Sequence, residues 1–179
     1  LAMTIQALGG KAVSLTGFQA GVFTEDIPSK AKILNITPTR IRDELAQGKA
    51  VVVTGFQGYN SLGDITTIGR SGSDTSAVAI AASLDADRCD IFTDLDGVYS
   101  TDPRDVPEAT KVESLSHEEM LEMASLGAGV LHPRAVEVGK THNLDIMVRN
   151  SHNDNPGTVV TQKQIEREDA VTGIAEDDH

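Results

Sequence analysis

Strand-like and helix-like segments alternate along nearly the whole of this 179-residue sequence. Short apolar runs typical of strands fall at residues 11–15, 32–36, 50–54, 88–93, 144–149 and 158–161. Segments with helical spacing fall at residues 1–8, 38–47, 73–84, 116–127 and 133–141. Strands that alternate with helices of about ten residues are typical of α/β domains. We therefore expect a three-layer αβα sandwich with a mainly parallel sheet.

Several helix starts carry local signals. Thr37 is an expected N-cap ahead of Pro38, and Ser73 is expected to cap the helix that follows it. Ser116 and Glu119 have the spacing of a capping box. The helix at 73–84 is apolar nearly all round, so we expect it to lie buried against a sheet. Residues 55–69 are expected to form two extended arms around a turn.

Composition limits the class of protein. With 39% apolar residues the chain can form a core, and 27 acidic against 15 basic residues give a net charge of -12. That balance offers no basic stripe for nucleic acid, although small anions can still bind locally. Cys89 is the single cysteine and is expected to be a buried residue in a reducing compartment. No membrane span or secretory signal is apparent, so we expect a cytoplasmic protein.

The two ends of the sequence suggest a longer polypeptide. Residues 1–8 already have the pattern of an amphipathic helix, and a charged stretch at 163–169 precedes a strand-like run at 170–175. We expect residues 1–162 to belong to one domain and residues 163–179 to be a linker with the start of another.

The segment TDLDGVYSTDPR, residues 93–104, follows the expected strand at 88–93. Asp94 to Gly97 supply short carboxylates and a glycine for a sharp turn, and a polar loop comes next. Ligands of open α/β sheets bind beyond the carboxyl ends of strands, so this loop is a candidate nucleotide site. Taken alone it is equally consistent with a surface loop. It is not a calcium loop, because the glycine comes two positions early and the closing glutamate is missing.

The segment TTIGRSGSDT, residues 66–75, precedes the apolar helix. Its glycines allow close backbone approach, and the N–H groups at a helix start attract anions. Arg70 adds a planar fork suited to carboxylate or phosphate. The alternative is an ordinary capped turn with Arg70 in solvent.

Taken in order, the segments resemble aspartate kinases. They are SLTGFQAG (14–21), VVVTGFQG (51–58), TTIGRSGSDTSAVAIA (66–81), TDLDGVYSTDPR, EEMLEMASLGAGVLHPRA (118–135) and PGT (156–158). The resemblance implies the amino-acid kinase fold. It also implies transfer of the γ-phosphoryl group of MgATP to the side-chain carboxylate of L-aspartate, which opens the pathway to lysine, threonine, methionine and isoleucine.

The resemblance also implies roles for residues. The implied ATP-binding residues are Thr93, Asp94, Tyr99, Ser100, Thr101, Asp102, Pro103 and Arg104. The implied substrate-binding residues are Arg70, Ser71, Gly72, Ser73 and Asp74, with Arg70 facing a substrate carboxylate and Asp74 as the catalytic residue. Because the aspartate carboxylate is already ionised at neutral pH, catalysis needs positioning and positive charge, including Mg²⁺, and no protein metal cage is expected.

Some features of the family do not occur in this sequence. The lysine- and glycine-rich KFGGTS-type segment and the family's substrate glutamate are missing, and Gly129 stands where many members have a lysine that reaches ATP. We therefore expect little activity from residues 1–179 alone. Residues 171–175 resemble the first strand of a regulatory ACT domain, through which the family suggests homo-oligomers. Two alternatives stay open: another amino-acid kinase, acting on glutamate, acetylglutamate, carbamate or a nucleoside monophosphate, and a non-catalytic nucleotide-binding module.

Overall fold

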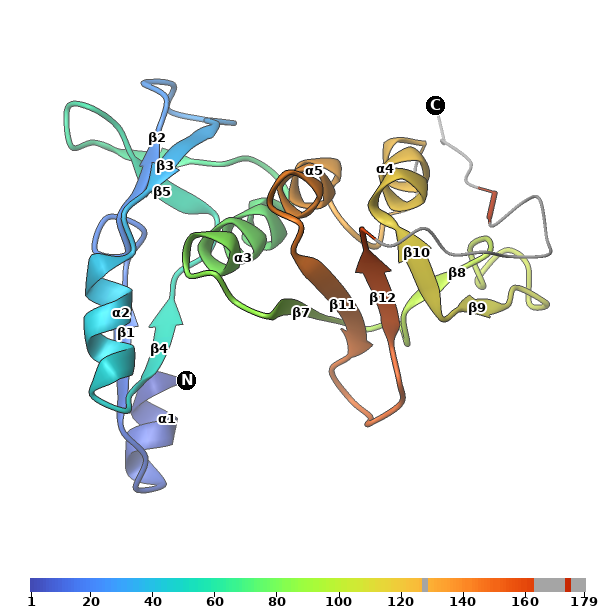
Figure 1. The fold of residues 1–179 in the computed structure, drawn as a ribbon, viewed down its shortest axis with the longest axis horizontal. Helices are drawn as coiled ribbons and strands as arrows, with labels where there is room; N and C mark the ends of the chain where they lie inside the picture. Colours follow the sequence, from blue (N-terminus) through green and yellow to red (C-terminus); the bar gives the residue numbers. More distant parts are fainter. Residues whose placement is uncertain (127–128, 163–172, 175–179) are drawn as a thin grey trace. The chain divides into compact units, whose positions relative to one another are not determined.

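The computed structural model describes residues 1–126, 129–162 and 173–174. The chain divides into two compact units, Leu1–Leu84 and Asp85–His179, which can be followed by colour from blue to red in Figure 1. The domain boundary expected after residue 162 and the strand expected at 170–175 fall almost entirely outside the described residues. Each unit is described by itself below.

Unit 1 contains three helices and six strands (Figure 1). In chain order they are α1 (Ala2–Ala7), β1 (Ala12–Leu15), β2 (Val22–Thr24), β3 (Ile33–Ile36), α2 (Thr39–Ala46), β4 (Ala50–Val53), β5 (Gln57–Tyr59), β6 (Ile65–Thr67) and α3 (Gly72–Ser83). Strands β1 and β4 pair in parallel over four residues. The other four strands form a sheet in the order β3-β2-β5-β6, in which β2 and β5 are parallel and the outer pairs are antiparallel.

The core of unit 1 lies between these strands and the helices. Its buried members are Leu15, Ala20, Val22, Ile41 and Ile68. Ile80 of α3 and Leu84, which follows the helix, pack against this cluster. Only Ser73 of α3 is exposed, so the predicted burial of this apolar helix is confirmed.

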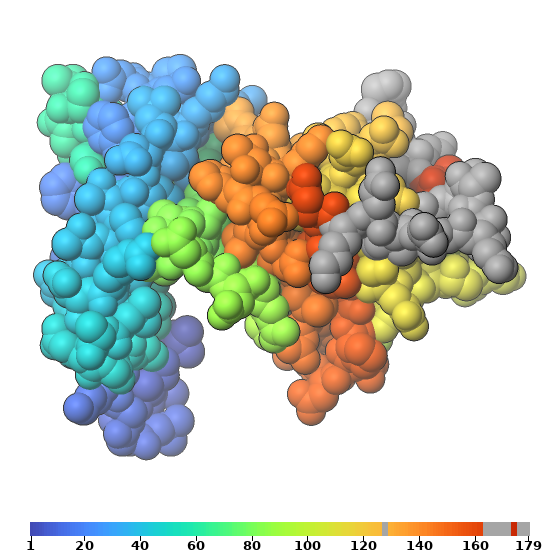
Figure 2. Space-filling view, in the orientation of Figure 1, coloured from blue at the N-terminus to red at the C-terminus, as the bar shows by residue number. Residues whose placement is uncertain are grey.

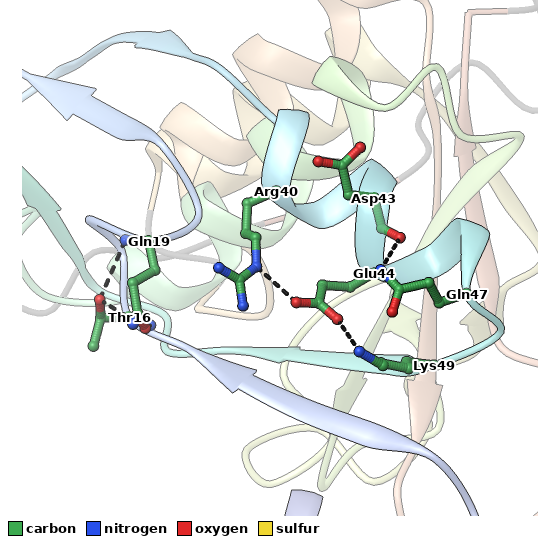
Figure 3. Close-up of polar contacts among 7 residues, drawn as sticks. All are labelled: Thr16, Gln19, Arg40, Asp43, Glu44, Gln47 and Lys49. Carbon is green, nitrogen blue, oxygen red and sulfur yellow. Dashed lines mark hydrogen bonds and ion pairs between the residues drawn. The ribbon is translucent and has the colours of Figure 1, made fainter.

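A buried carboxylate joins α2 to the start of β4 (Figure 3). Glu44 Oε1 lies 2.7 Å from Arg40 Nε, and Glu44 Oε2 lies 2.5 Å from Lys49 Nζ. The Glu44 side chain is only 7% exposed. Hydrogen bonds from Lys49 and then from Arg40 lower the pKa of Glu44 below its ordinary value. Glu44 therefore stays ionised at neutral pH, and its ion pair with Lys49 holds α2 next to the start of β4.

The described residues of unit 2 form six strands and two helices. In chain order they are β7 (Arg88–Thr93), β8 (Val98–Tyr99), β9 (Lys111–Val112), β10 (Ser114–Ser116), α4 (His117–Ser125), α5 (Pro133–His142), β11 (Asp145–Asn150) and β12 (Thr158–Thr161). The main sheet has the order β10-β12-β11-β7, and β8 pairs with β9 in an antiparallel hairpin. Strands β7 and β11 are parallel over six residue pairs.

One face of this sheet is buried. Leu115, Met120, Val136, Ile146, Val148 and Val160 are all fully buried. Helices α4 and α5 pack against each other, yellow beside orange in Figure 2. Cys89 of β7 is buried, as its apolar setting predicted. Within the described residues, no helix has both the length and the apolar character needed to cross a membrane.

The α/β class is confirmed, and the longest registers, β7 with β11 and β1 with β4, are parallel. Antiparallel pairing is confined to shorter registers of two or three residues. Strands β2, β9 and β10 were not predicted, because runs of two or three residues carry no readable period. Tyr99 was expected in a loop but ends the two-residue strand β8. The helix expected at 116–127 ends at Ser125, and residue 127 lies outside the described residues.

The three predicted helix caps had different outcomes. The Ser116 capping box is confirmed, since both of its hydrogen bonds are present. The Thr37 cap was wrong: α2 has Pro38 as its N-cap, because the Thr37 N–H donates to Gly21 and continues the strand pairing. The Ser73 cap was also wrong, because α3 begins at Gly72 and has the left-handed Ser71 as its N-cap.

Candidate functional site

The loop before α3 turns sharply into the helix. Gly69 has φ of +102°, and Ser71, the N-cap, has φ of +54°. The Gly72 N–H donates to the Gly69 carbonyl at 3.0 Å and closes the turn. No side-chain hydrogen bond caps the start of α3. The positive end of the helix dipole lies at the same place, so the loop suits an anion.

A second loop, after β4, holds this turn in place. Phe56 has φ of +72°, an uncommon conformation for a bulky residue. Its N–H donates to Ser76 Oγ at 3.1 Å, and Ser76 Oγ donates to the Gly72 carbonyl at 2.7 Å. The Phe56 carbonyl accepts from the Ile68 N–H at 2.9 Å. The start of α3 and the end of β4 are therefore one connected structure.

Phe56 was not among the predicted site residues, although the sequence carries a signal for it. The tetrapeptide TGFQ occurs twice, at residues 16–19 and 54–57. Both copies follow strands that pair in parallel, β1 and β4, so the two loops leave the same edge of the pair. The Gly17 N–H donates to Gln57 Oε1 at 3.3 Å, which links the loops directly. The Phe56 side chain is 43% exposed beside the α3 turn.

The structure brings the predicted residues 70–74 together at the start of α3. Arg70, Ser71 and Ser73 are exposed, Gly72 is buried and Asp74 is half-buried. Ser73 Oγ donates to Asp74 Oδ1 at 3.3 Å. Asp74 lies in the first helical turn, where the dipole stabilises its negative charge. This cluster presents one guanidinium, two hydroxyls and helix N–H groups to solvent.

The predicted nucleotide residues begin where β7 ends, in unit 2. Thr93 Oγ1 donates to Asp94 Oδ1 at 3.0 Å, and Asp94 is exposed. Gly97 has φ of +142°, and a Cβ there would come within 2.5 Å of Thr158 Oγ1. Thr158 Oγ1 accepts from the Val98 N–H at 2.8 Å, which fastens the turn to β12. Gly97 is thus required both for its conformation and for its close approach.

The remaining nucleotide residues lie between β8 and β9. The Ser100 N–H donates to the Thr110 carbonyl at 2.9 Å, which continues the hairpin. Arg104 Nη2 lies 2.6 Å from Asp102 Oδ2, and its side chain is 81% exposed. The Arg104 guanidinium, together with its backbone N–H, lowers the pKa of Asp102 to about 2. Arg104 is therefore held close to the loop while its charge faces solvent.

The structure thus assembles each predicted group within its own unit: residues 70–74 in unit 1 and residues 93–104 in unit 2. Among the described residues, no atom lies within 4 Å of a Cβ built on Gly129. Two histidines have structural partners: His117 Nε2 lies 3.0 Å from the Leu144 carbonyl, and His132 caps α5. In the described ranges no three His, Cys, Asp or Glu side chains converge as metal ligands would.

A hollow of about 490 Å³ lies elsewhere in unit 2 and includes none of the predicted site residues. Arg88, Lys111, Met147, Arg149 and Val159 are among its lining residues. Arg88 and Arg149 are both paired with Asp90, at 2.8 and 3.4 Å. The positive charge of these two arginines is therefore partly neutralised by Asp90.

Known proteins resemble this chain over most of its length. Residues 1–150 match the model of the amino acid kinase family. The chain is 52% identical to an aspartokinase of Geobacillus stearothermophilus over 99% of its length, and it spans 44% of that protein. Escherichia coli aspartokinase III, solved in complex with aspartate and ADP, superposes with a TM-score of 0.85 at 30% identity, over 92% of this chain and 38% of that one. An aspartate kinase of Synechocystis gives 0.77 at 45% identity, over 96% of this chain and 28% of that one.

Proposed function

This chain belongs to the amino acid kinase family, and from that premise we propose that it forms part of an aspartate kinase. The activity is phosphoryl transfer from MgATP to the side-chain carboxylate of L-aspartate, giving 4-phospho-L-aspartate and ADP. The observation that carries the proposal is a likeness to aspartokinases that runs over almost the entire chain and includes both candidate loops. Because the chain spans less than half of these relatives, we assign the reaction to a polypeptide of their length.

The reaction requires little acid–base chemistry. A carboxylate oxygen of aspartate attacks the γ-phosphorus, an O–P bond forms, and the bond between that phosphorus and the β–γ bridging oxygen breaks. The nucleophile is already ionised, because an aspartate side chain has a pKa of about 3.9. The obstacle is the approach of two anions, so the protein must align them and supply positive charge.

In this proposal, unit 1 holds the aspartate and the transferring phosphate. Arg70 is exposed at the turn and has the fork geometry that pairs with a carboxylate. The N–H groups at the start of α3 supply partial positive charge. Asp74, next to Ser73, is the catalytic residue that orients the reacting groups.

Unit 2 holds the nucleotide in this proposal. The residues at 93–104 form an exposed edge with a ring at Tyr99 and a guanidinium at Arg104. Mg²⁺ is usually held by one or two carboxylates and the substrate phosphates, and the exposed Asp94 is a suitable ligand. When bound, Mg²⁺ would neutralise charge on the phosphates.

Three further assignments belong to the proposal. The pathway is the synthesis of lysine, threonine and related amino acids, the location is the cytoplasm, and the assembly is a homo-oligomer. The first follows from the reaction product. The second agrees with the single buried cysteine, which suits a reducing compartment. The third rests on the family resemblance alone.

The test is formation of aspartyl phosphate, trapped as its hydroxamate, by the polypeptide that contains residues 1–179. We expect MgATP-dependent product with L-aspartate and none with glutamate, acetylglutamate or carbamate. We expect residues 1–179 alone to form little product, since clamps on the transferring phosphoryl group supply several kcal/mol of stabilisation. Transfer to another acceptor, or calorimetric ATP binding without transfer to any, would reject the proposal in favour of another kinase or a binding module.

A further inference from the structure

The side chain of Asp96 accepts hydrogen bonds from three asparagines. Asn150 Nδ2 lies 2.7 Å and Asn153 Nδ2 lies 2.8 Å from Asp96 Oδ1, and Asn155 Nδ2 lies 3.1 Å from Asp96 Oδ2. All four residues belong to unit 2. Asp96 and Asn150 are half-buried, and Asn153 and Asn155 are exposed. We call this group the Asp96 cluster. It is absent from the predicted site residues.

The loop that carries the asparagines is built to present these donors. The Asn150 side-chain oxygen accepts from the His152 N–H at 2.7 Å, and that of Asn153 accepts from the Asn155 N–H at 3.0 Å. Each of these two amides therefore uses its oxygen on its own loop and its nitrogen on Asp96. If the two amides were turned round, their oxygens would face the Asp96 carboxylate, and their hydrogen bonds to Asp96 and to their own loop would both be lost.

The cluster joins the two chain segments that leave β7 and β11. Thr93 and Asn150 are register partners at the ends of these parallel strands, and the Ser151 N–H donates to the Thr93 carbonyl at 2.8 Å. Asn150 Nδ2 also donates to the Asp94 carbonyl at 3.2 Å. The far end of the same loop enters β12 at Thr158, which binds the Val98 N–H. Residues 150–158 are thus fastened at both ends to residues 93–98.

The carboxylate itself is poorly suited to contact a nucleotide. Its oxygens are occupied by three amide donors, and these bonds lower the pKa of Asp96, with Asn153 contributing most. Asp96 therefore stays ionised at neutral pH. Its asparagine partners carry no charge and do not neutralise it, so the carboxylate would repel phosphate. What the cluster fixes is the position of Asp94 and of the turn that leads to Tyr99 and Arg104.

We propose that Asp96, which lies within the loop at 93–104, is a positioning residue: its carboxylate accepts hydrogen bonds from Asn150, Asn153 and Asn155 and so holds residues 93–98 in the conformation that binds nucleotide. This inference rests on the proposed function, because it assigns residues 93–104 to the nucleotide. It adds a residue that acts through the loop and touches neither substrate.

The test compares three variants of the polypeptide that contains residues 1–179. Asp96→Ala removes all three bonds. The double variant Asp96→Asn with Asn155→Asp exchanges the two groups, so that the new amide can donate to the new carboxylate. Asp154→Asn is the matched control, because it removes one negative charge from the same loop at an exposed position outside the cluster. Two readouts are used: amide hydrogen exchange without ligand, and calorimetric titration with MgADP.

In Asp96→Ala the hydrogen bonds of the Asp96 cluster are gone, so local opening of this loop costs less free energy. We therefore expect amide hydrogen exchange at Val98 and Ser151 to become about tenfold faster or more. We expect the Kd for MgADP to rise by about three- to tenfold, which corresponds to roughly the net contribution of one ordinary hydrogen bond. The exchanged pair should recover much of both effects, and Asp154→Asn should match the unaltered chain.

Two results would overturn the inference in different ways. If the unaltered chain binds MgADP and Asp96→Ala changes neither exchange nor affinity, the positioning role is wrong and the proposed function stands. If exchange responds but the unaltered chain shows no MgADP binding, the assignment of this loop to nucleotide fails and the inference fails with it.

Discussion

The two candidate loops are held in place by different means. The loop at 70–74 in unit 1 is fixed by backbone conformation: Ser71 and the adjoining Phe56 both have left-handed φ, and Gly72 is buried against Ile68. The loop at 93–104 in unit 2 is fixed by side-chain hydrogen bonds to Asp96, Asp102 and Thr158. A strained backbone costs about 1–3 kcal/mol per residue and persists only where the surrounding core imposes it.

This difference predicts where function and folding can be separated. In unit 1 the exposed side chains can be changed without touching the structure that aims them. In unit 2 the polar side chains are themselves the supports, so a change there should alter both the loop and its ligand. The predictions below start from the largest expected effect.

The sharpest contrast should come from Arg70→Ala in the polypeptide that contains this chain. Because Arg70 is exposed, we expect an unchanged melting temperature and a kcat/KM for aspartate that falls by about 10²–10³, the usual result of removing one strong oxyanion partner. The KM for ATP should change little. Arg42→Ala on α2 is the control, and a comparable loss of activity there would show that the effect is one of general charge.

Gly97→Ala should lower the stability of unit 2. The left-handed φ and the contact with Thr158 Oγ1 make a side chain unfavourable, and we expect a loss of about 1–3 kcal/mol in the free energy of unfolding. Gly129→Ala is the matched control, since its Cβ meets nothing, and it should lie within about 0.5 kcal/mol of the unaltered protein. Urea denaturation measures both, and equal stabilities would contradict the described turn.

Gly129→Lys tests the position at which the resemblance to aspartate kinases implies a lysine that reaches ATP. The space around Gly129 accepts a side chain, so folding should be unaffected. If residues 93–104 hold the nucleotide, an added cation should tighten MgATP binding by roughly two- to tenfold through charge-assisted bonds. Gly129→Gln keeps the length without the charge, and an equal gain with glutamine would remove the electrostatic explanation.

The smallest effect concerns acid stability of unit 1. The pKa of Glu44 is lowered by Lys49 and Arg40 below its ordinary value of 4.5. The ion pairs therefore contribute fully above that value, and their contribution is lost as pH falls through the lower pKa of the folded state. We expect the melting temperature of the unaltered protein to fall more steeply below pH 4.5 than that of Glu44→Gln, and parallel curves would show that Glu44 does not control this loss.

Much of the fold could be predicted from local patterns. The bounds of strand β7 were predicted correctly, because its six residues form one readable run in the sequence. The capping box was also predicted correctly, because Ser116 and Glu119 have a recognisable spacing. The start of α2 was misplaced for a tertiary reason: the Thr37 N–H donates to the carbonyl of Gly21, which lies 16 positions earlier. No local pattern contains that contact.

The site divides in the same way. Residues 70–74 and 93–104 could be named because each is a contiguous segment with a distinctive order of residues. Asp96 could not, since its importance arises from contacts across the fold, and the sequence signal for Phe56 is only the repeated TGFQ. Phe56 depends on Ser76 and Ile68, and Asp96 depends on asparagines more than 50 positions away.

The most direct test of the two-part site is nuclear magnetic resonance of the isotope-labelled 179-residue chain, titrated separately with MgADP and with L-aspartate. We predict that MgADP shifts the amide signals of residues 93–104 and leaves those of 70–74 unchanged in the absence of aspartate. L-Aspartate should shift the signals of 70–74 and leave those of 93–104. Nucleotide-induced shifts confined to unit 1, or aspartate-induced shifts confined to unit 2, would contradict the assignment of one substrate to each loop.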